Sequence, residues 1–285
     1  MITRREAVTG LAAASLGPAL LGMRDAHKID VGLELYSLRD DMKRDVPGTL
    51  KRVRQMGFDH VEAPSLYGLS AADFRRALDG AGLKAAALVA PYDQLKNNLA
   101  DVQANLETLG ARWALLPWIN HGDKFERGDA ERAVKDMNAW GKALHTAGYK
   151  FAYHVHGYEF QPAAEGTLLD LMAQTTDAET VKFQLDTFWI VWPGQDCVAL
   201  MRRYPMRFRI LHLKDLRKGV KGDLSGQAPV DNSVVLGDGV VPWEQVLAVA
   251  REQQVEDYFI EDESTRAAEQ IPLSLGYLRK LQVIE

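Results

Sequence analysis

Eight short apolar runs of β-strand character alternate with segments of helical period, and this alternation constrains the fold more than any other feature of the 285-residue chain. The runs lie near residues 31–36, 59–64, 84–90, 112–117, 150–156, 182–187, 208–213 and 257–261. Near-continuous apolar strands that alternate with amphipathic helices are typical of a parallel sheet covered by helices, and eight such units close into a barrel. We therefore predict a single (β/α)8 TIM barrel over residues 29–285.

The segments between the runs carry helical signals. Val46, Leu50 and Val53 fall on one helical face, and Ser70 followed by Asp73 predicts a capped helix start. An open, doubly wound α/β sheet is the alternative. Such a sheet usually has a glycine-rich phosphate loop after its first strand, and the segment VGLELYSLRDD has none.

The longest irregular stretch runs from about residue 216 to residue 241, after the seventh predicted strand, and is rich in glycine. Long loops in compact domains are commonly functional, so this stretch is a candidate lid over a site. The alternative is a mobile surface excursion without a role.

The first residues differ from the rest of the chain. Thr3-Arg4-Arg5 precedes an apolar stretch from Ala7 to Met23 that is interrupted by glycine and proline. This pattern is typical of a twin-arginine signal peptide. We expect residues 1–28 to be this signal and a short linker, and the protein to be periplasmic or otherwise exported, with no stable membrane span in the mature chain. A helix packed on the barrel and an uncleaved anchor are the alternatives.

The charge and cysteine content limit which classes of partner and which kinds of metal site are expected. A net charge of -5 and a pI near 5.8 leave no broad basic surface, which disfavours nucleic acid as a partner and an endonuclease of similar shape. The single cysteine, Cys197, cannot form an internal disulfide or a thiolate-rich zinc site. A metal would therefore be held by oxygen and imidazole. The sequence shows no interface stripe for a homo-oligomer, which stays open.

Four metal-type ligands stand at the ends of four predicted strands. The runs FAYHVH, VKFQLD, FRILHL and DYFIED bring His154, Asp186, His212 and Glu261 to these positions. The carboxyl ends of barrel strands meet at one face, where the active sites of such barrels lie. The sequence therefore predicts a divalent-cation site at the mouth of the barrel.

Other side chains at this face suit a small polar substrate. Lys214 follows His212 by two residues and is expected to hydrogen-bond substrate oxygens, with a salt bridge to Asp186 or Glu261 as the alternative. No ring of arginines is present at the last two strand ends, so an unphosphorylated sugar is favoured over a sugar phosphate. Candidate substrate-binding residues are Glu34, Tyr36, Trp118 and Trp189, because aromatic faces pack on sugar rings.

The ordered segments YHVHGYEF, FQLDTFWIVWPGQD, ILHLKD, LGDGVVPWEQVL and YFIEDES resemble the sugar phosphate isomerase/epimerase family, which has a xylose isomerase-like TIM barrel. The resemblance covers essentially all of residues 30–285. It implies one divalent metal ion, often manganese, magnesium, cobalt or zinc, bound by side chains of strands 5 to 8. Asp186, His212 and Glu261 are similar to the family's ligands on strands 6, 7 and 8.

Strand 5 departs from the commoner pattern of this family, in which a glutamate is the first ligand. In this chain His154 takes the place of that glutamate. In an alternative alignment, shifted along the strand, Glu159 would reach the metal instead. Because strand side chains alternate, His154 and His156 are expected to face the same way, one on the metal and the other on the substrate. An imidazole in place of a carboxylate favours softer ions over magnesium.

The resemblance implies an isomerase or epimerase that moves a proton on a carbon next to a carbonyl, with the cation stabilising an enediolate. The candidate acid/base residues are Glu159 and Glu62, with His156 as runner-up. Lyase, dehydratase or hydrolase action on a 3-keto-glycoside, with the same site, is one alternative. A noncatalytic sugar-binding barrel is the other. Of the neighbouring carboxylates Asp262 and Glu263, one is expected to cap the last helix and one to be solvated.

Overall fold

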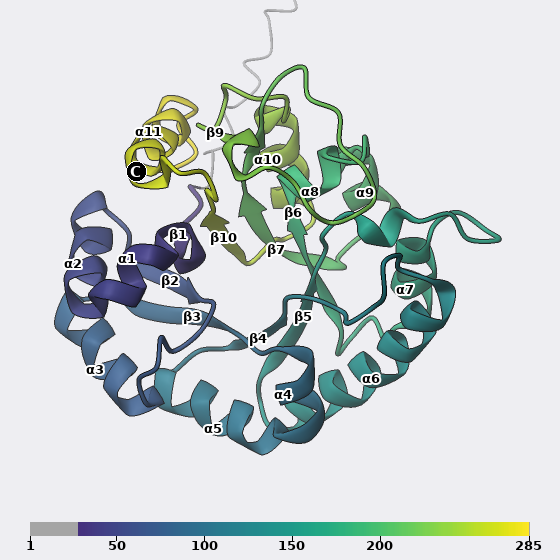
Figure 1. The fold of residues 1–285 in the computed structure, drawn as a ribbon, viewed down its shortest axis with the longest axis horizontal. Coiled ribbons are helices and arrows are strands. Elements are labelled where there is room, and N and C mark those ends of the chain that lie inside the picture. Colours follow the sequence, from purple (N-terminus) through teal and green to yellow (C-terminus); the bar gives the residue numbers. More distant parts are fainter. Residues whose placement is uncertain (1–27, 285) are drawn as a thin grey trace, which may run out of the picture.

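Eight parallel strands close into one barrel in the computed structural model, which describes residues 28–284 (Figure 1). Their order around the barrel is β1-β10-β7-β6-β5-β4-β3-β2. The strands are β1 (Val31–Glu34), β2 (His60–Ala63), β3 (Lys84–Val89), β4 (Trp113–Leu116), β5 (Lys150–His154), β6 (Lys182–Asp186), β7 (Phe208–Leu213) and β10 (Asp257–Ile260). Each lies within one predicted run, so the closed barrel is confirmed. The predicted signal segment lies outside the described residues, apart from Lys28.

Helices surround the barrel on its outside (Figure 1). The helices are α1 (Arg39–Arg44), α2 (Val46–Met56), α3 (Ala71–Ala81), α4 (Tyr92–Asn97), α5 (Leu99–Leu109), α6 (Arg127–Thr146), α7 (Leu168–Thr175), α8 (Thr187–Val191), α9 (Cys197–Arg203), α10 (Trp243–Glu252) and α11 (Ala267–Lys280). Short 3-10 turns are η1 (Leu35–Leu38), η2 (Tyr158–Phe160) and η3 (Val230–Asn232). In this part of the chain no helix is long and apolar enough to cross a membrane.

Local sequence signals set the helix ends. The Ser70 side chain accepts a hydrogen bond from the Asp73 backbone N–H at 3.1 Å, which satisfies one of the free donors at the start of α3. Gly82 ends the same helix with a left-handed φ of 72°, a conformation that costs other residues more than glycine. The predicted capped start is therefore confirmed.

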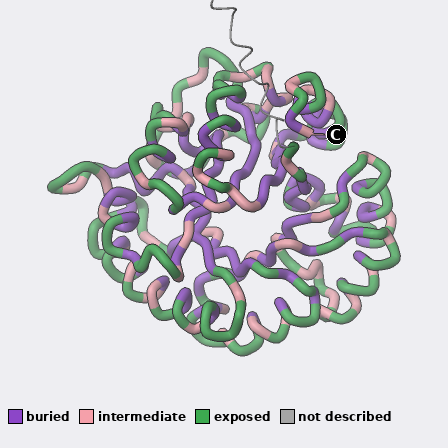
Figure 2. The backbone as a smooth tube through the Cα atoms, turned by 180° about the vertical axis from the view of Figure 1, so that it is seen from behind, coloured by how far each residue is buried: buried purple, intermediate pink, exposed green. Residues whose placement is uncertain are grey.

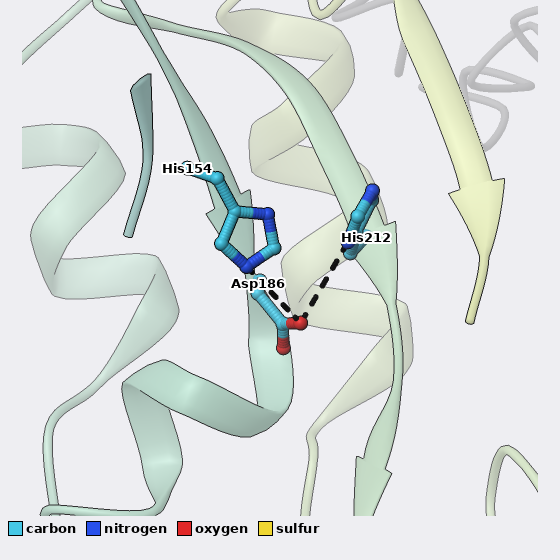
Figure 3. Close-up of side chains that lie close together, drawn as sticks. All are labelled: His154, Asp186 and His212. Carbon is cyan, nitrogen blue, oxygen red and sulfur yellow. Dashed lines mark ion pairs between the residues drawn. The ribbon is translucent and has the colours of Figure 1, made fainter. Parts of the chain in front are cut away.

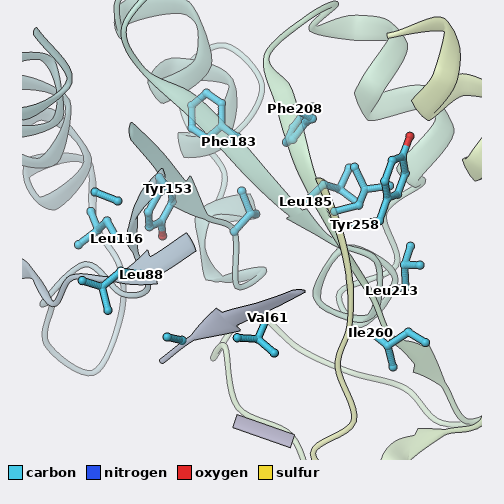
Figure 4. Close-up of a cluster of buried hydrophobic side chains, with 14 of the residues drawn as sticks. Val61, Leu88, Leu116, Tyr153, Phe183, Leu185, Phe208, Leu213, Tyr258 and Ile260 are labelled. Atoms are coloured by element: carbon cyan, nitrogen blue, oxygen red, sulfur yellow. The ribbon is translucent and has the colours of Figure 1, made fainter. Parts of the chain in front are cut away.

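The strands bury both of their faces, which explains their near-continuous apolar sequence. One face fills the barrel interior with a small cluster formed by Ala87, Trp113, Leu115, Ala152, Ile210 and Phe259. The other face packs against the helices in a larger cluster, to which Val61, Leu116, Phe183 and Ile260 belong (Figure 4). Figure 2 shows the buried backbone at the centre and the exposed backbone on the outer helices. Polar residues at interior positions are therefore exceptions that need an explanation.

The stretch after β7 is more ordered than the sequence indicated. β8 (Asp215–Leu216) pairs antiparallel with β9 (Ser233–Val234), so the expected irregular stretch contains a small sheet of its own. The fully buried Asp215 carboxylate accepts hydrogen bonds from the backbone N–H of Leu216 at 2.9 Å, Gly237 at 2.9 Å and Val241 at 3.1 Å. One side chain thus holds the first and the last residues of this excursion together.

Candidate metal and substrate site

A cavity of about 550 Å³ opens at the carboxyl ends of the strands. Its volume lies in the range of about 300–1,000 Å³ typical of small-molecule sites. Nine of its lining residues carry polar or aromatic chemistry that the sequence analysis singled out, namely Glu34, Tyr36, Glu62, Trp118, His154, His156, Trp189, His212 and Glu261. The predicted substrate residues and three of the four predicted metal ligands therefore line one cavity at the predicted end of the barrel, and the fourth, Asp186, is fully buried.

Three predicted metal ligands, His154, Asp186 and His212, lie close together (Figure 3). Asp186 Oδ2 lies 3.8 Å from His154 Nε2 and 3.8 Å from His212 Nδ1, and the three atoms all lie within 4.8 Å of one another. Both His154 Nε2 and Asp186 Oδ2 are buried, and neither has a hydrogen-bond partner among the described residues. Buried polar atoms without partners are costly, and a divalent cation would satisfy them. The residues present fit such an ion.

Glu261 and Lys214 adjoin this cluster. Glu261 Oε2 lies 2.9 Å from His212 Nδ1, so the fourth predicted ligand faces the same nitrogen. The buried Lys214 ammonium lies 3.5 Å from Glu261 Oε2 and 3.8 Å from Asp186 Oδ2, and it also pairs with Glu263. Lys214 is thus held in the salt bridges that were the alternative to a substrate contact. It supplies fixed positive charge behind the cluster.

Neighbouring charges shift the pKa values of His212 and Glu261. Burial disfavours the charged form of His212, but Glu62 and Glu261 outweigh it and hold its pKa well above the usual range. Burial would likewise raise the pKa of Glu261, but Lys214 and His212 hold that pKa well below the usual range. A carboxylate must be ionised to bind a metal ion, so Glu261 is in the state that its predicted role as a ligand requires.

A second pair of carboxylates lies on the neighbouring strands. Glu34 of β1 and Glu62 of β2 are aligned across the two strands. Glu62 accepts from His212 Nε2 at 3.0 Å, whereas Glu34 Oε2 is buried without a hydrogen-bond partner among the described residues. Burial, and then the charge of Glu62, raise the pKa of Glu34 well above the usual range. A protonated Glu34 can donate a hydrogen bond to a substrate oxygen.

The end of β5 distinguishes the two alignments left open for the strand 5 ligand. His154 faces Asp186, and His154 and His156 have ring centroids 4.3 Å apart, so both face the cavity as alternation predicts. Glu159 turns away from the cavity lining. Its carboxylate accepts from the His156 backbone N–H at 3.0 Å and from the Tyr153 hydroxyl, and burial raises its pKa to about 7.

Aromatic rings and the lid form the cavity walls. The His156 ring lies between Trp118 and Trp189, with centroid distances of 5.2 and 5.6 Å. Tyr36, which follows β1 on the other side of the cavity, is 42% exposed. Gly226, Gln227 and Ala228 of the lid also line the cavity. The predicted lid therefore touches the site.

Two residues of the site were missed by the sequence analysis. Glu263 was expected to cap a helix or be solvated, yet it lines the cavity and pairs with Lys214, while Asp262 accepts from the Ser264 backbone N–H. Gln184 lies on β6 two residues before Asp186 and is fully buried at the cavity floor. A polar residue in an apolar run, in phase with a ligand, was the signal that could have identified it.

Comparison with protein families places this geometry among known barrels. Residues 50–281 match the family model described as a xylose isomerase-like TIM barrel. Inosose dehydratase 2 of Bacillus cereus (strain ZK / E33L) is 27% identical over 153 residues, which cover 51% of this chain and 50% of that protein. The chain spans about half the length of the curated relatives it matches.

Solved structures share the fold. A sugar phosphate isomerase/epimerase from Parabacteroides distasonis ATCC 8503 superposes with a TM-score of 0.75 and 21% identity, covering 90% of this chain and 99% of that one. A xylose isomerase-like TIM barrel protein from Mycobacterium smegmatis, solved in complex with magnesium, has a TM-score of 0.69 and 16% identity over 92% and 99% of the two chains. At these identities the similarity establishes the architecture alone.

Proposed function

Because the chain belongs to the xylose isomerase-like TIM barrel family, we propose that it is a metal-dependent isomerase or epimerase of an unphosphorylated keto sugar or related polyol. The observation that carries the proposal is the pair of buried polar atoms without hydrogen-bond partners, His154 Nε2 and Asp186 Oδ2, of which His154 lines a sugar-sized cavity. His154, Asp186, His212 and Glu261 would hold the ion. When bound, a divalent cation supplies Lewis-acid stabilisation of negative charge on neighbouring substrate oxygens.

Side chains in the cavity supply the proton transfers in this proposal. Glu62 and His156 both reach the cavity, so either can accept a proton from a carbon next to a carbonyl. Glu159 lies behind His156 and acts through it, by holding the backbone of that residue. The Lys214 ammonium contributes positive charge that favours a developing oxyanion.

The walls of the cavity orient the sugar. Trp118 and Trp189 offer flat apolar faces to a ring, and Glu34 offers a hydrogen bond to a hydroxyl or carbonyl. Water is restricted by the lid residues 226–228, which contact the same cavity. A small-molecule sugar is the partner whose size this cavity of about 550 Å³ fits.

A lyase is the second candidate, because the matched relatives include inosose dehydratases. The same loss of a proton next to a carbonyl can be followed by departure of a group from the β-carbon, as in a dehydratase or in cleavage of a 3-keto-glycoside. No additional residues are needed for this outcome. The fate of the substrate after proton removal separates the two activities.

The test combines metal analysis with proton exchange. Purified protein is analysed for bound metal and incubated in D2O with keto sugars and 3-keto-glycosides, while NMR follows the proton next to the carbonyl. Solvent deuterium appearing in substrate supports proton abstraction, and the product shows whether isomerisation, epimerisation or elimination follows. Protein that holds no cation and exchanges no proton after addition of Mn²⁺ would instead be a sugar-binding barrel.

We also propose that the protein is exported through its twin-arginine segment. The support is the pair Arg4-Arg5 before an apolar stretch. Replacing both arginines by lysine should leave the protein in the cytoplasmic fraction, whereas the unchanged chain should appear outside it. An equal distribution of the two chains would contradict export by this route.

A further inference from the structure

We propose that Gln184 is a positioning residue that joins Glu62 to His154 and fixes the tautomer of His154, so that an unprotonated Nε2 faces Asp186. The inference rests on the proposed metal-dependent function, since it concerns the same cluster. Gln184 belongs to β6, and it is fully buried at the floor of the cavity. An interior amide of this kind must find partners for both of its ends.

Two short hydrogen bonds occupy the amide. Gln184 Nε2 donates to Glu62 Oε2 at 2.7 Å, and Gln184 Oε1 lies 2.7 Å from His154 Nδ1. His154 and Gln184 are aligned on the adjacent strands β5 and β6, so the backbone itself brings these two side chains together. The contact is therefore a property of the barrel register and does not depend on a flexible loop.

The chemistry of the three groups fixes the direction of each bond. A carboxylate has only acceptors, so the amide must direct its N–H toward Glu62. The amide oxygen then faces His154, and an oxygen can only accept, so His154 Nδ1 must carry the proton. Neutral His154 is left with an unprotonated Nε2. This is the atom that lies 3.8 Å from Asp186 Oδ2 without a hydrogen-bond partner among the described residues.

The same carboxylate also orients the second histidine of the cluster. Glu62 Oε1 lies 3.0 Å from His212 Nε2, and His212 directs Nδ1 toward Asp186. One carboxylate thus aims both imidazoles at a shared point, His212 directly and His154 through Gln184. Partners of this type set the tautomer of a ligand, and their loss typically lowers metal affinity about 10- to 100-fold.

The first experiment reads the tautomer in the metal-free full chain by NMR of ¹⁵N-histidine, with the His154 signal identified by its loss in His154→Asn. We expect a neutral ring with its proton on Nδ1. In Gln184→Met the acceptor is gone, and we expect a mixture of tautomers. In Gln184→Glu an acceptor remains, and we expect the Nδ1 proton to be retained. A wild-type proton on Nε2, or the same spectrum in Gln184→Met, would overturn the proposal.

The second experiment measures Zn²⁺ affinity of the metal-free protein by calorimetry. We expect Gln184→Met to bind about 10- to 100-fold more weakly than wild type. The control is Gln270→Met, which removes another buried glutamine. Gln270 lies on α11, donates to the Ser264 hydroxyl and does not line the cavity, so this variant should bind as wild type does. Equal weakening in both variants would mean a purely structural effect and contradict the proposal. A wild-type chain that binds no cation would refute the proposed function, whereas the tautomer measurement would still decide the role of Gln184.

Discussion

Charged side chains differ in their pairing between the two ends of the barrel. At the amino-terminal end, Glu256 pairs with Lys150 and Arg209, and Asp257 accepts from Arg112 and from the Trp113 ring N–H. At the carboxyl end, the buried groups of the site retain atoms without partners. The two carboxylates Glu256 and Asp257 are thus paired within the protein, whereas His154 Nε2 and Asp186 Oδ2 at the other end have no partner among the described residues. We therefore expect changes to the paired carboxylates to affect stability, and changes at the carboxyl end to affect the proposed activity.

The largest expected effect is on activity at the carboxyl end. Asp186→Asn removes the charge of a ligand but keeps a side-chain oxygen that can accept from the Trp189 backbone N–H, as Asp186 Oδ1 does at 3.0 Å. We expect kcat/KM to fall by more than the ~100-fold upper range seen for outer partners of a metal. Thermal unfolding should change little. Activity close to wild type would refute the cluster as the catalytic centre.

The next effect compares one lysine from each end. Lys214 is fully buried among carboxylates, so Lys214→Met leaves unpaired buried charge and should cost about 3–5 kcal/mol of unfolding free energy in the metal-free protein. Lys150 is half-exposed in its pair with Glu256, so Lys150→Met should cost less than about 1 kcal/mol. Urea unfolding of the two variants measures the difference. Equal losses would contradict the contrast between the two ends.

The pH dependence of stability should also differ between the ends. The unfolded chain loses the Glu159 proton near pH 4.5, whereas the folded protein keeps it to about pH 7, so the stability it contributes below pH 4.5 is lost as the pH rises to about 7. The loss is on the order of 3 kcal/mol. Unfolding free energies of wild type and Glu159→Gln across this range should therefore diverge.

Glu256 should give the opposite sign at the other end. Burial would raise its pKa, but hydrogen bonds from Lys150 and Arg209 lower it, so the stability contributed at neutral pH is lost as the pH falls. A comparison of Glu256→Gln with wild type at acid and neutral pH checks this. If both glutamates changed the unfolding free energy with pH in the same direction, the proposed electrostatic difference between the two ends would be wrong.

The smallest effect is expected at the lid. A side chain at Gly226 would place its Cβ 2.6 Å from a Tyr158 ring carbon, whereas Gly219 has no heavy atom within 4 Å of that position. Both residues have a left-handed φ, so each alanine variant should carry a similar strain of about 1–2 kcal/mol. Gly226→Ala alone should raise KM severalfold, because it displaces lid residues that line the cavity. Steady-state kinetics that do not distinguish the two variants would argue against a lid.

The fold was predictable because its signals are local and repeated. Each strand is a short apolar run, and glycines and caps such as Gly82 and Ser70 mark the helix ends. The small β8–β9 sheet was not predicted, since each strand has only two residues and its anchor is the buried Asp215, which pairs with backbone N–H groups more than 20 residues away. Contacts of this kind have no local pattern.

The candidate site was predictable for those residues whose position depends only on the alternation of side chains along a strand. His154, Asp186 and His212 stand at strand ends, and their convergence follows from barrel closure. The placement of Glu159 depends instead on a turn at Gly157, where φ is 89° and the chain folds the carboxylate back onto the His156 backbone. Glu263 follows the last strand, and its inward direction depends on the pair with Lys214, which follows the neighbouring strand β7.

The hydrogen bonds accepted by Asp215 determine which part of the chain after β7 can change in length or sequence. Because a single carboxylate gathers both ends of the excursion, its interior can be lengthened, shortened or exchanged without moving the strands beneath it. We therefore expect that a foreign segment grafted between Leu216 and Ser233, which keeps β9 and the Asp215 hydrogen bonds, can change the cavity wall without changing the strand-end residues.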